Sequence, residues 1–256
     1  MTTKKITPFF LGLLLLQWGC LGNMQAIQAP QLTERLPKAK PIRLVNPLAT
    51  VYDQDPIDDE PTMPKDKSAA LASRILKELG RQIKAMGWPV AQSIPMDWND
   101  IASGEEISAE QTTFGDQQSQ ATLRIMRQLE QIGRHLRYNE SIEQKQISNQ
   151  RVDAADTKAL TKEGSLLFAM VIGCDGLLTH GPCRNIQSPP LRDYDRRYSL
   201  NRTVPAGMAL HLFWVNAADG QLLWYDTTRS FNADQFFDNN ISAIVTDTLE
   251  EFPAPP

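Results

Sequence analysis

The chain has 256 residues, of which 41% are apolar and 22% are charged, and its net charge is −4. These values are typical of a globular protein with one domain, or with one domain and an arm. The acidic balance argues against nucleic acid as a partner, and it does not favour attraction to anionic lipid surfaces.

The first 22 residues have the pattern of an export signal. Two lysines precede an apolar run over residues 9–16, and the small residue Gly19 then stands before Cys20. The run is shorter than the ~20 residues that a membrane-spanning helix needs. We therefore expect residues 1–22 to direct export, and the mature, soluble part of the protein to lie on the periplasmic side of the cell envelope.

Cys20 leaves two routes of export open. Residues 16–20 resemble the bacterial lipobox, whose cysteine is lipidated and becomes the new N-terminus, although Gln17 and Trp18 differ from the residues usual there. By the same resemblance, Leu21 in place of Asp implies an anchor in the outer membrane. The alternative is ordinary cleavage a few residues later, which would discard Cys20 and release a free periplasmic protein. We expect the lipid-anchored form.

The predicted elements of the first two thirds alternate between strands and helices. Residues 23–41 contain three prolines and few large apolar groups, and they predict an extended tether. Apolar periodicity then predicts a strand over 42–45, a helix over 66–86, a strand over 88–94 parallel to the first, and helices over 119–138 and 153–162.

The loop predicted over residues 46–65 is rich in proline and in acidic side chains. Its acids are Asp53, Asp55, Asp58, Asp59 and Glu60. Alternating carboxylates suit a calcium ion, but the spacing lacks the central glycine and the closing glutamate of an EF-hand. A solvated loop is the favoured interpretation.

The last third of the chain changes to the period of strands. A continuous apolar run predicts a buried strand over residues 165–178, and Asp219–Gly220 lies between two alternating runs at 206–216 and 221–231, which is typical of a β-hairpin. A helix over 234–252 closes the chain. This order predicts an α+β fold, in which a mixed sheet with a C-terminal antiparallel meander packs against several helices. We expect one domain over residues 42–253, with a polar helical insert near 97–151.

Cys174 and Cys183 are predicted to form a disulfide. Either export route removes Cys20 from the free thiols, and the glycines and proline between the remaining two let the chain turn back on itself. Closing so short a loop contributes about 2.5 kcal/mol in the chain-entropy model. A catalytic thiol, or a zinc site that also uses His180, is the less favoured alternative, because zinc would lack a fourth ligand.

Other signatures of chemistry are missing from the sequence. His135 and His211 are interpreted as a surface residue and a sheet-face residue. The chain contains no glycine-rich phosphate loop, no G-x-S-x-G turn and no H-E-x-x-H pair. We therefore expect no catalytic residue, no bound metal and no cofactor.

Residues 189–205 are the best candidate for binding a partner protein. Arginine and tyrosine, which are enriched in interface hot spots, interleave with aspartates in this long connection between strands. The candidate residues are Arg192, Tyr194, Arg196, Arg197, Tyr198 and Arg202. A solvated loop without a partner is the alternative.

Several segments resemble envelope lipoproteins that contain a TolB N-terminal-like domain, a group that includes curli-assembly and penicillin-binding-protein-activator lipoproteins. They are Gly164 to Phe168, the hairpin from Val215 to Trp224, and the closing residues Leu249 to Pro253. The resemblance implies an α+β domain that organises envelope complexes and performs no chemistry. The sequence thus predicts a non-enzymatic scaffold or docking module for envelope proteins; the alternative is a soluble periplasmic domain that binds a ligand or hydrolyses a substrate.

Overall fold

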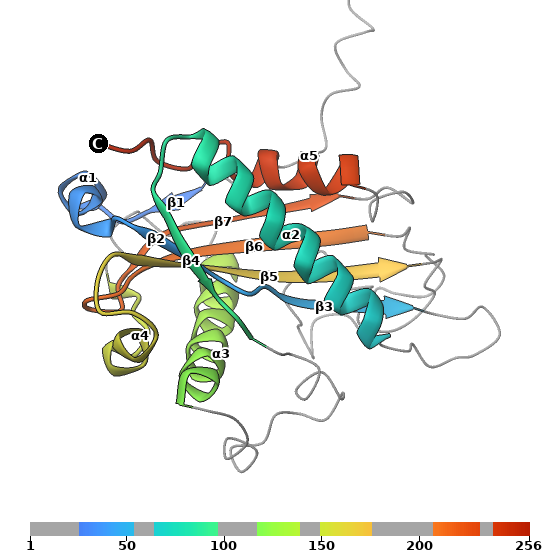
Figure 1. Ribbon diagram of the computed structural model, residues 1–256, viewed down its shortest axis with the longest axis horizontal. Coiled ribbons are helices and arrows are strands. Elements are labelled where there is room, and N and C mark those ends of the chain that lie inside the picture. Colours follow the sequence, from blue (N-terminus) through green and yellow to red (C-terminus); the bar gives the residue numbers. More distant parts are fainter. Residues whose placement is uncertain (1–25, 54–63, 97–116, 139–148, 176–206, 231–237) are drawn as a thin grey trace, which may run out of the picture.

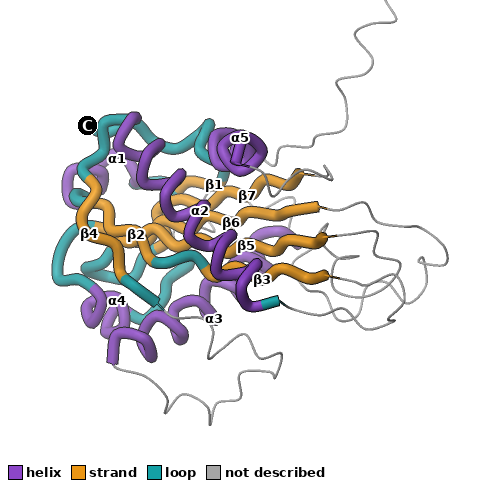
Figure 2. Tube along the Cα trace, turned by 45° about the vertical axis from the view of Figure 1, so that its right-hand side comes forward, coloured by secondary structure: helices purple, strands orange, loops and turns teal. Residues whose placement is uncertain are grey.

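The computed structural model describes residues 26–53, 64–96, 117–138, 149–175, 207–230 and 238–256. Within these ranges, seven strands form one mixed sheet, and helices cover both of its faces. Figure 1 shows the helices α2 and α5 in front of the strands and α3 behind them, and the turned view in Figure 2 shows the same layers. The predicted α+β class, with a mixed sheet and several helices, is confirmed.

The elements follow one another from β1 to α5. The first six are β1 (Ile27–Gln28), α1 (Leu32–Arg35), the 3-10 helix η1 (Leu36–Ala39), β2 (Ile42–Val45), β3 (Leu48–Asp53) and α2 (Lys65–Ala85). The others are β4 (Val90–Ile94), α3 (Gln117–Tyr138), α4 (Ala154–Leu160), β5 (Ser165–Asp175), β6 (Gly207–Asn216), β7 (Leu222–Ser230) and α5 (Asp238–Thr248).

The sheet has the order β1-β7-β6-β5-β2-β4, and β3 also pairs with β5. β2 and β3 lie one after the other along the same side of β5, both parallel to it. β4 runs parallel to β2, as predicted from the helix between them. β5, β6 and β7 form the predicted antiparallel meander. The parallel and antiparallel halves therefore meet at β5.

Aromatic side chains fill the core on the face of the sheet covered by α2 and α5. Trp214 of β6 and Trp224 of β7 are fully buried there, together with Trp88 and Phe252 from the segments that follow the two helices. The ring centroid of Trp214 lies 5.2 Å from that of Trp88 and 4.9 Å from that of Phe252. The Trp88 indole also donates a hydrogen bond of 2.8 Å to the carbonyl oxygen of Pro253. We call these four residues the aromatic cluster.

On the opposite face, α3 lies directly against β6 and β7. Side chains alternate along a strand, so the neighbours of the two tryptophans, Phe213 and Tyr225, point to this side. Their ring centroids are 4.7 Å apart. Gly133 of α3 lies over them so closely that an added Cβ would be 3.0 Å from Phe213 Cζ. A residue without a side chain thus allows the helix to approach the sheet.

The turn of the β6–β7 hairpin requires a glycine at position 220. Gly220 has a φ angle of +69°, a backbone conformation that side chains with a Cβ rarely adopt. Its position is also crowded, because a Cβ would meet the carbonyl oxygen of Val152. The Asp219–Gly220 signal therefore identified the hairpin correctly, with residues 216–221 between Val215 and Leu222, the last pair of the ladder.

Three expectations about the organisation of the chain need correction. The described part of the predicted tether, residues 26–41, forms β1, α1 and η1 and packs on the sheet, because its small and apolar residues recur at helical steps; these are Ala29, Leu32, Leu36 and Ala39. The predicted loop over 46–65 begins with a strand, β3, which pairs with the buried strand β5. Finally, α3 belongs to the hydrophobic core, although it falls within the expected polar insert at 97–151.

Candidate docking surface

Most of the residues predicted to be functional lie outside the described residues. These are Cys20, Cys183, Arg192, Tyr194, Arg196, Arg197, Tyr198 and Arg202, together with the acids of the predicted calcium loop beyond Asp53. Cys174 lies in β5, where its backbone is opposite Tyr52 of β3 and Gly207 of β6. The disulfide and the partner-binding segment therefore stay predictions.

The two described histidines differ in their burial. His135 is exposed on α3. His211 is buried in β6 on the α3 side, where its Nδ1 lies 3.3 Å from the hydroxyl oxygen of Tyr225 and its ring is nearly parallel to that of Phe213. His211 is thus a sheet-face residue, as predicted. Within the described ranges, no group of three or more His, Cys, Asp or Glu residues converges as metal ligands would.

Tyr52 of β3 has a pKa above its ordinary value. Burial raises the pKa of the Tyr52 hydroxyl, and the negative charge of Glu130 on α3 raises this pKa further. Tyr52 therefore stays protonated at every physiological pH. A neutral hydroxyl next to a carboxylate suits a packing contact between sheet and helix.

Several polar clusters of the described fold join one element to another. Arg35 of α1 forms an ion pair of 2.8 Å with Asp219 in the hairpin turn. Arg124 of α3 holds Asp156 of α4 through both carboxylate oxygens. Ser165 of β5 accepts a hydrogen bond of 2.7 Å from the Trp214 indole and donates one of 2.6 Å to the carbonyl of Ala39. These contacts bind the N-terminal segment, the sheet and the helices into one unit.

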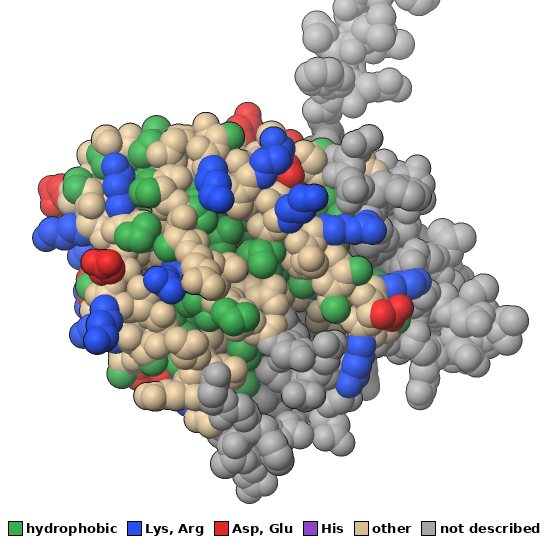
Figure 3. Space-filling view, viewed as in Figure 1, with side chains coloured by type: hydrophobic (Ala, Val, Ile, Leu, Met, Phe, Trp, Pro, Cys, Tyr) green, Lys and Arg blue, Asp and Glu red, His purple; other side chains and the backbone are tan. Residues whose placement is uncertain are grey.

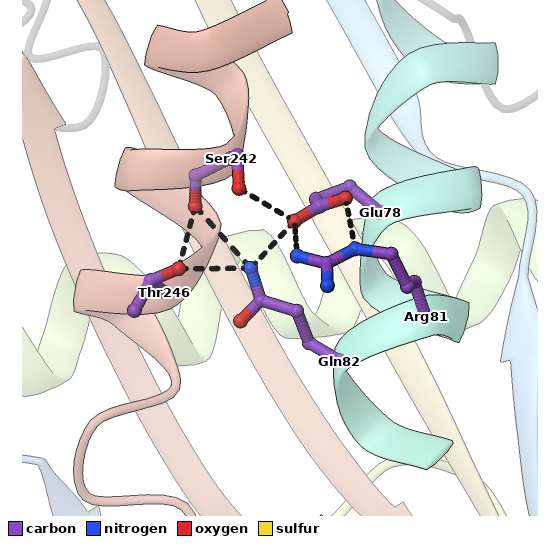
Figure 4. A network of polar contacts seen from close by, with 5 residues as sticks. All are labelled: Glu78, Arg81, Gln82, Ser242 and Thr246. Atoms are coloured by element: carbon purple, nitrogen blue, oxygen red, sulfur yellow. Dashed lines mark hydrogen bonds and ion pairs between the residues drawn. The ribbon is translucent and has the colours of Figure 1, made fainter. Parts of the chain in front are cut away.

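The largest of these clusters joins α2 to α5 (Figure 4). Glu78 Oε1 accepts hydrogen bonds from Arg81 Nη2 at 2.5 Å, Gln82 Nε2 at 2.7 Å and the hydroxyl of Ser242 at 2.8 Å. Gln82 Nε2 also donates to the hydroxyl oxygen of Thr246 at 2.9 Å. Two residues of α5 are thereby bound to one turn of α2, and we call these five residues the helix clamp.

Glu78 is ionised within the helix clamp. Hydrogen bonds from Arg81, Gln82 and Ser242, with the positive charge of Arg81, outweigh the effect of burial and lower the pKa of Glu78 to about 2. The Glu78 side chain is 16% exposed, whereas that of Arg81 is 62% exposed. The carboxylate is thus ionised at neutral pH and holds a basic side chain at the surface.

The outward side of α2 is basic. Its buried residues follow one another at steps of three to four positions, and the basic residues occupy the opposite side; these are Lys67, Arg74, Lys77, Arg81 and Lys84, all exposed. In Figure 3, Lys and Arg side chains follow the course of α2 across this face of the molecule. We call these five residues the basic face of α2. In the sequence, these residues are visible only as polar positions of a predicted helix.

Comparison with known proteins adds no family to this description, because no family model, no curated protein and no solved structure matches the chain. Of the helices in the described ranges, none has both the length and the apolar character that crossing a bilayer requires. The helical layer formed by α2 and α5, which the helix clamp fixes and whose outward side is basic, is the candidate docking surface.

Proposed function

We propose that this protein is an exported, lipid-anchored scaffold of the bacterial cell envelope, which docks other envelope components and performs no chemistry of its own. The signal pattern over residues 1–22 and Cys20 supports the export and the anchor. The observation that carries the docking role is the α2–α5 layer, in which a long helix is fixed to its neighbour by the helix clamp and presents an exposed charged side.

A second docking element is the arginine- and tyrosine-rich segment at residues 189–205. It follows β5 and precedes β6 along the chain, so it connects two central strands of the sheet. Arginine and tyrosine combine contact area with directional hydrogen bonds, which suits a partner protein. In this proposal, the segment binds envelope proteins and the lipid anchor at Cys20 keeps the scaffold at the outer membrane, with no nucleic acid and no cofactor involved.

The proposal is tested by crosslinking in living cells, followed by affinity purification from the membrane fraction. The parent protein is expected to start at a lipidated Cys20 by mass spectrometry and to capture a defined set of envelope proteins. Replacement of Arg196, Arg197 and Tyr198 with alanine is expected to abolish this capture, because it removes three hot-spot side chains without touching the described core.

The matched control replaces three exposed basic residues elsewhere, Lys38, Arg151 and Lys158, with alanine. It is expected to retain capture, and both variants are expected to keep the melting temperature of the parent. An unmodified N-terminus beyond residue 20 would remove the anchor from the proposal. Equal capture by the parent and the Arg196, Arg197 and Tyr198 variant would exclude the segment as the docking element.

A further inference from the structure

The basic face of α2 stands out against the charge of the whole chain. α2 has six basic and two acidic side chains, a net charge of +4, in a chain whose net charge is −4. One of the acids, Glu78, points toward α5 and neutralises Arg81. Charge is therefore distributed unevenly, and one helix is strongly positive in an acidic protein.

The fold does not use the charges of Lys77 and Lys84. The apolar side of α2 is already covered by the sheet, with Leu71, Ile75, Leu79 and Ile83 all buried. In the described structure, neither Lys77 nor Lys84 is part of an ion pair, and both are exposed. Two positive charges thus stand on the surface with no partner inside the described fold.

We propose that the basic face of α2 docks the domain on the headgroups of anionic phospholipids. The face is about 25 Å long, since 17 residues separate Lys67 from Lys84 at 1.5 Å each. The small residues Ala70 and Ser73 lie exposed along it, so that the long basic side chains extend beyond their neighbours. A row of cations without directional pockets matches a surface of many equivalent phosphates.

A lipid surface fits this face better than a partner protein does. Protein interfaces depend on a few buried aromatic or arginine anchors in pockets, whereas the exposed positions on the outward side of α2 hold only lysine, arginine, alanine, one serine and one aspartate, Asp66. Because the apolar side of α2 is occupied by the sheet, the helix would rest on the headgroups and would not insert into the bilayer.

The acidity of the whole chain does not prevent this contact. At physiological ionic strength, charges are screened over about 8 Å, so the acids on the far side of the domain are shielded from the membrane much more than the contacting lysines are. The same screening makes the interaction sensitive to salt. Net charge therefore governs long-range repulsion, while the basic face determines which side touches the lipid.

This inference deepens the proposed function and rests on it in one respect, since export and the anchor bring the domain within reach of a membrane. Its test is separate, because vesicle binding in vitro requires neither. The parent and every variant carry Cys20→Ser, so that no acyl chain contributes to vesicle binding. They also have identical N-terminal segments. Co-sedimentation is measured with vesicles of phosphatidylcholine alone and with vesicles that also contain phosphatidylglycerol.

The parent protein is expected to bind the anionic vesicles in about 0.05 M salt and to be released in about 0.5 M salt, where screening is nearly complete. The Lys77→Gln and Lys84→Gln double variant is expected to bind about 30-fold more weakly, since each basic residue near an anionic surface adds about 1 kcal/mol to the binding free energy. Its circular dichroism and melting temperature are expected to match those of the parent.

The matched control is the Lys158→Gln and Lys162→Gln double variant, which removes the same charge from exposed positions in and after α4. It is expected to bind within about threefold of the parent, because these residues lie beside α3 on the other side of the sheet. The proposal would be overturned if the two double variants lost vesicle binding equally. It would also be overturned if the parent protein bound neutral and anionic vesicles equally well. A third outcome would also overturn it: the Lys77→Gln and Lys84→Gln variant binds vesicles like the parent but no longer captures an envelope protein. The basic face of α2 would then be a protein interface, and the proposed scaffold function would still stand.

Discussion

The two long helices of this protein have nearly equal lengths but very different surroundings. More than half of the residues of α2 are exposed, and most of these lie on the side away from the sheet. On α3, the exposed residues among the described side chains are Gln117, Gln118, Gln131 and His135. The sheet covers one side of each helix, and α3 also contacts α4 through Arg124 and Asp156.

This difference shows that helices with similar apolar stripes can have different roles, one within the packed interior and one at the surface. α3 is an internal element, pressed against Phe213 and Tyr225 at Gly133. α2 is an external element, whose outward side is available to a ligand because the helix clamp and the aromatic cluster already hold it in place. Function is therefore expected on the α2 side, and changes on the α3 side are expected to affect stability first.

The largest effect is expected at Trp214, at the centre of the aromatic cluster. Trp214→Ala removes a fully buried indole and its hydrogen bond to Ser165, and it is expected to lower the free energy of unfolding by about 4 kcal/mol. Chemical denaturation measures this loss. Trp214→Phe keeps a ring in the cluster and is expected to cost less than half as much. A smaller loss in Trp214→Ala than in a helix clamp variant would mean that surface contacts hold the α2–α5 layer.

The same substitution in the two long helices is expected to have opposite effects. Gly133→Ala places a methyl group 3.0 Å from the buried ring of Phe213, which Tyr225 holds in place, and is expected to destabilise the protein by about 1 to 2 kcal/mol. Gly80→Ala on α2 meets only the end of the Leu44 side chain at 3.5 Å.

Gly80→Ala is therefore expected to stabilise the protein by about 0.5 to 1 kcal/mol, through the higher helix propensity of alanine. Thermal unfolding of the two variants beside the parent distinguishes the outcomes. If both variants shifted the melting temperature in the same direction, α2 and α3 would not differ in how closely they are packed at these two glycines.

A smaller effect is expected from the helix clamp, and it depends on pH. Glu78→Gln is expected to lower the free energy of unfolding by about 1 kcal/mol at pH 7, because the exposed Arg81 is screened by water and the pair is worth less than its close geometry implies. The pKa of Glu78 is lowered from 4.5 to about 2 in the folded protein, so this stabilisation is complete above about pH 4.5 and is lost as the pH falls toward 2.

The stability difference between the parent and Glu78→Gln is expected to shrink over this pH range when urea denaturation is repeated at each pH. Glu250→Gln, at an exposed position after α5, serves as the control and is expected to change little at any pH. A difference that stays constant from pH 7 to pH 2 would show that the charge of Glu78 is not what stabilises the clamp.

Local patterns predicted most of this fold, because its helices and central strands have strong periodicity. The helices over 66–86 and 119–138, the parallel strands β2 and β4, and the meander were all predicted within a few residues of their bounds. Strand β3 was not predicted, because prolines and acids surround its six residues and its stability comes from pairing with β5, more than 100 residues away. The packing of residues 26–41 was missed for a similar reason, since three prolines obscured the spacing of small apolar groups that contact the distant hairpin.

The candidate site was harder to predict than the fold. The charges of α2 are visible in the sequence. Whether an exposed lysine could bind a ligand, however, depends on which other residues surround it in the folded protein. The helix clamp joins Glu78 to Ser242 across 164 residues, and no local pattern indicates that contact. Conversely, the residues that drew most attention in the sequence, Cys183 and the arginines near position 196, lie outside the described residues and stay predictions.

The position of Phe252 has a consequence for the order in which this chain reaches its final form. Phe252 fills the space between Trp214 and Trp224, and the carbonyl of Pro253 satisfies the indole of Trp88. During synthesis, those tryptophans emerge before the residues that cover them. The chain therefore cannot complete its core until residues 252 and 253 are available, and a product truncated just before them would display its tryptophans to chaperones and proteases.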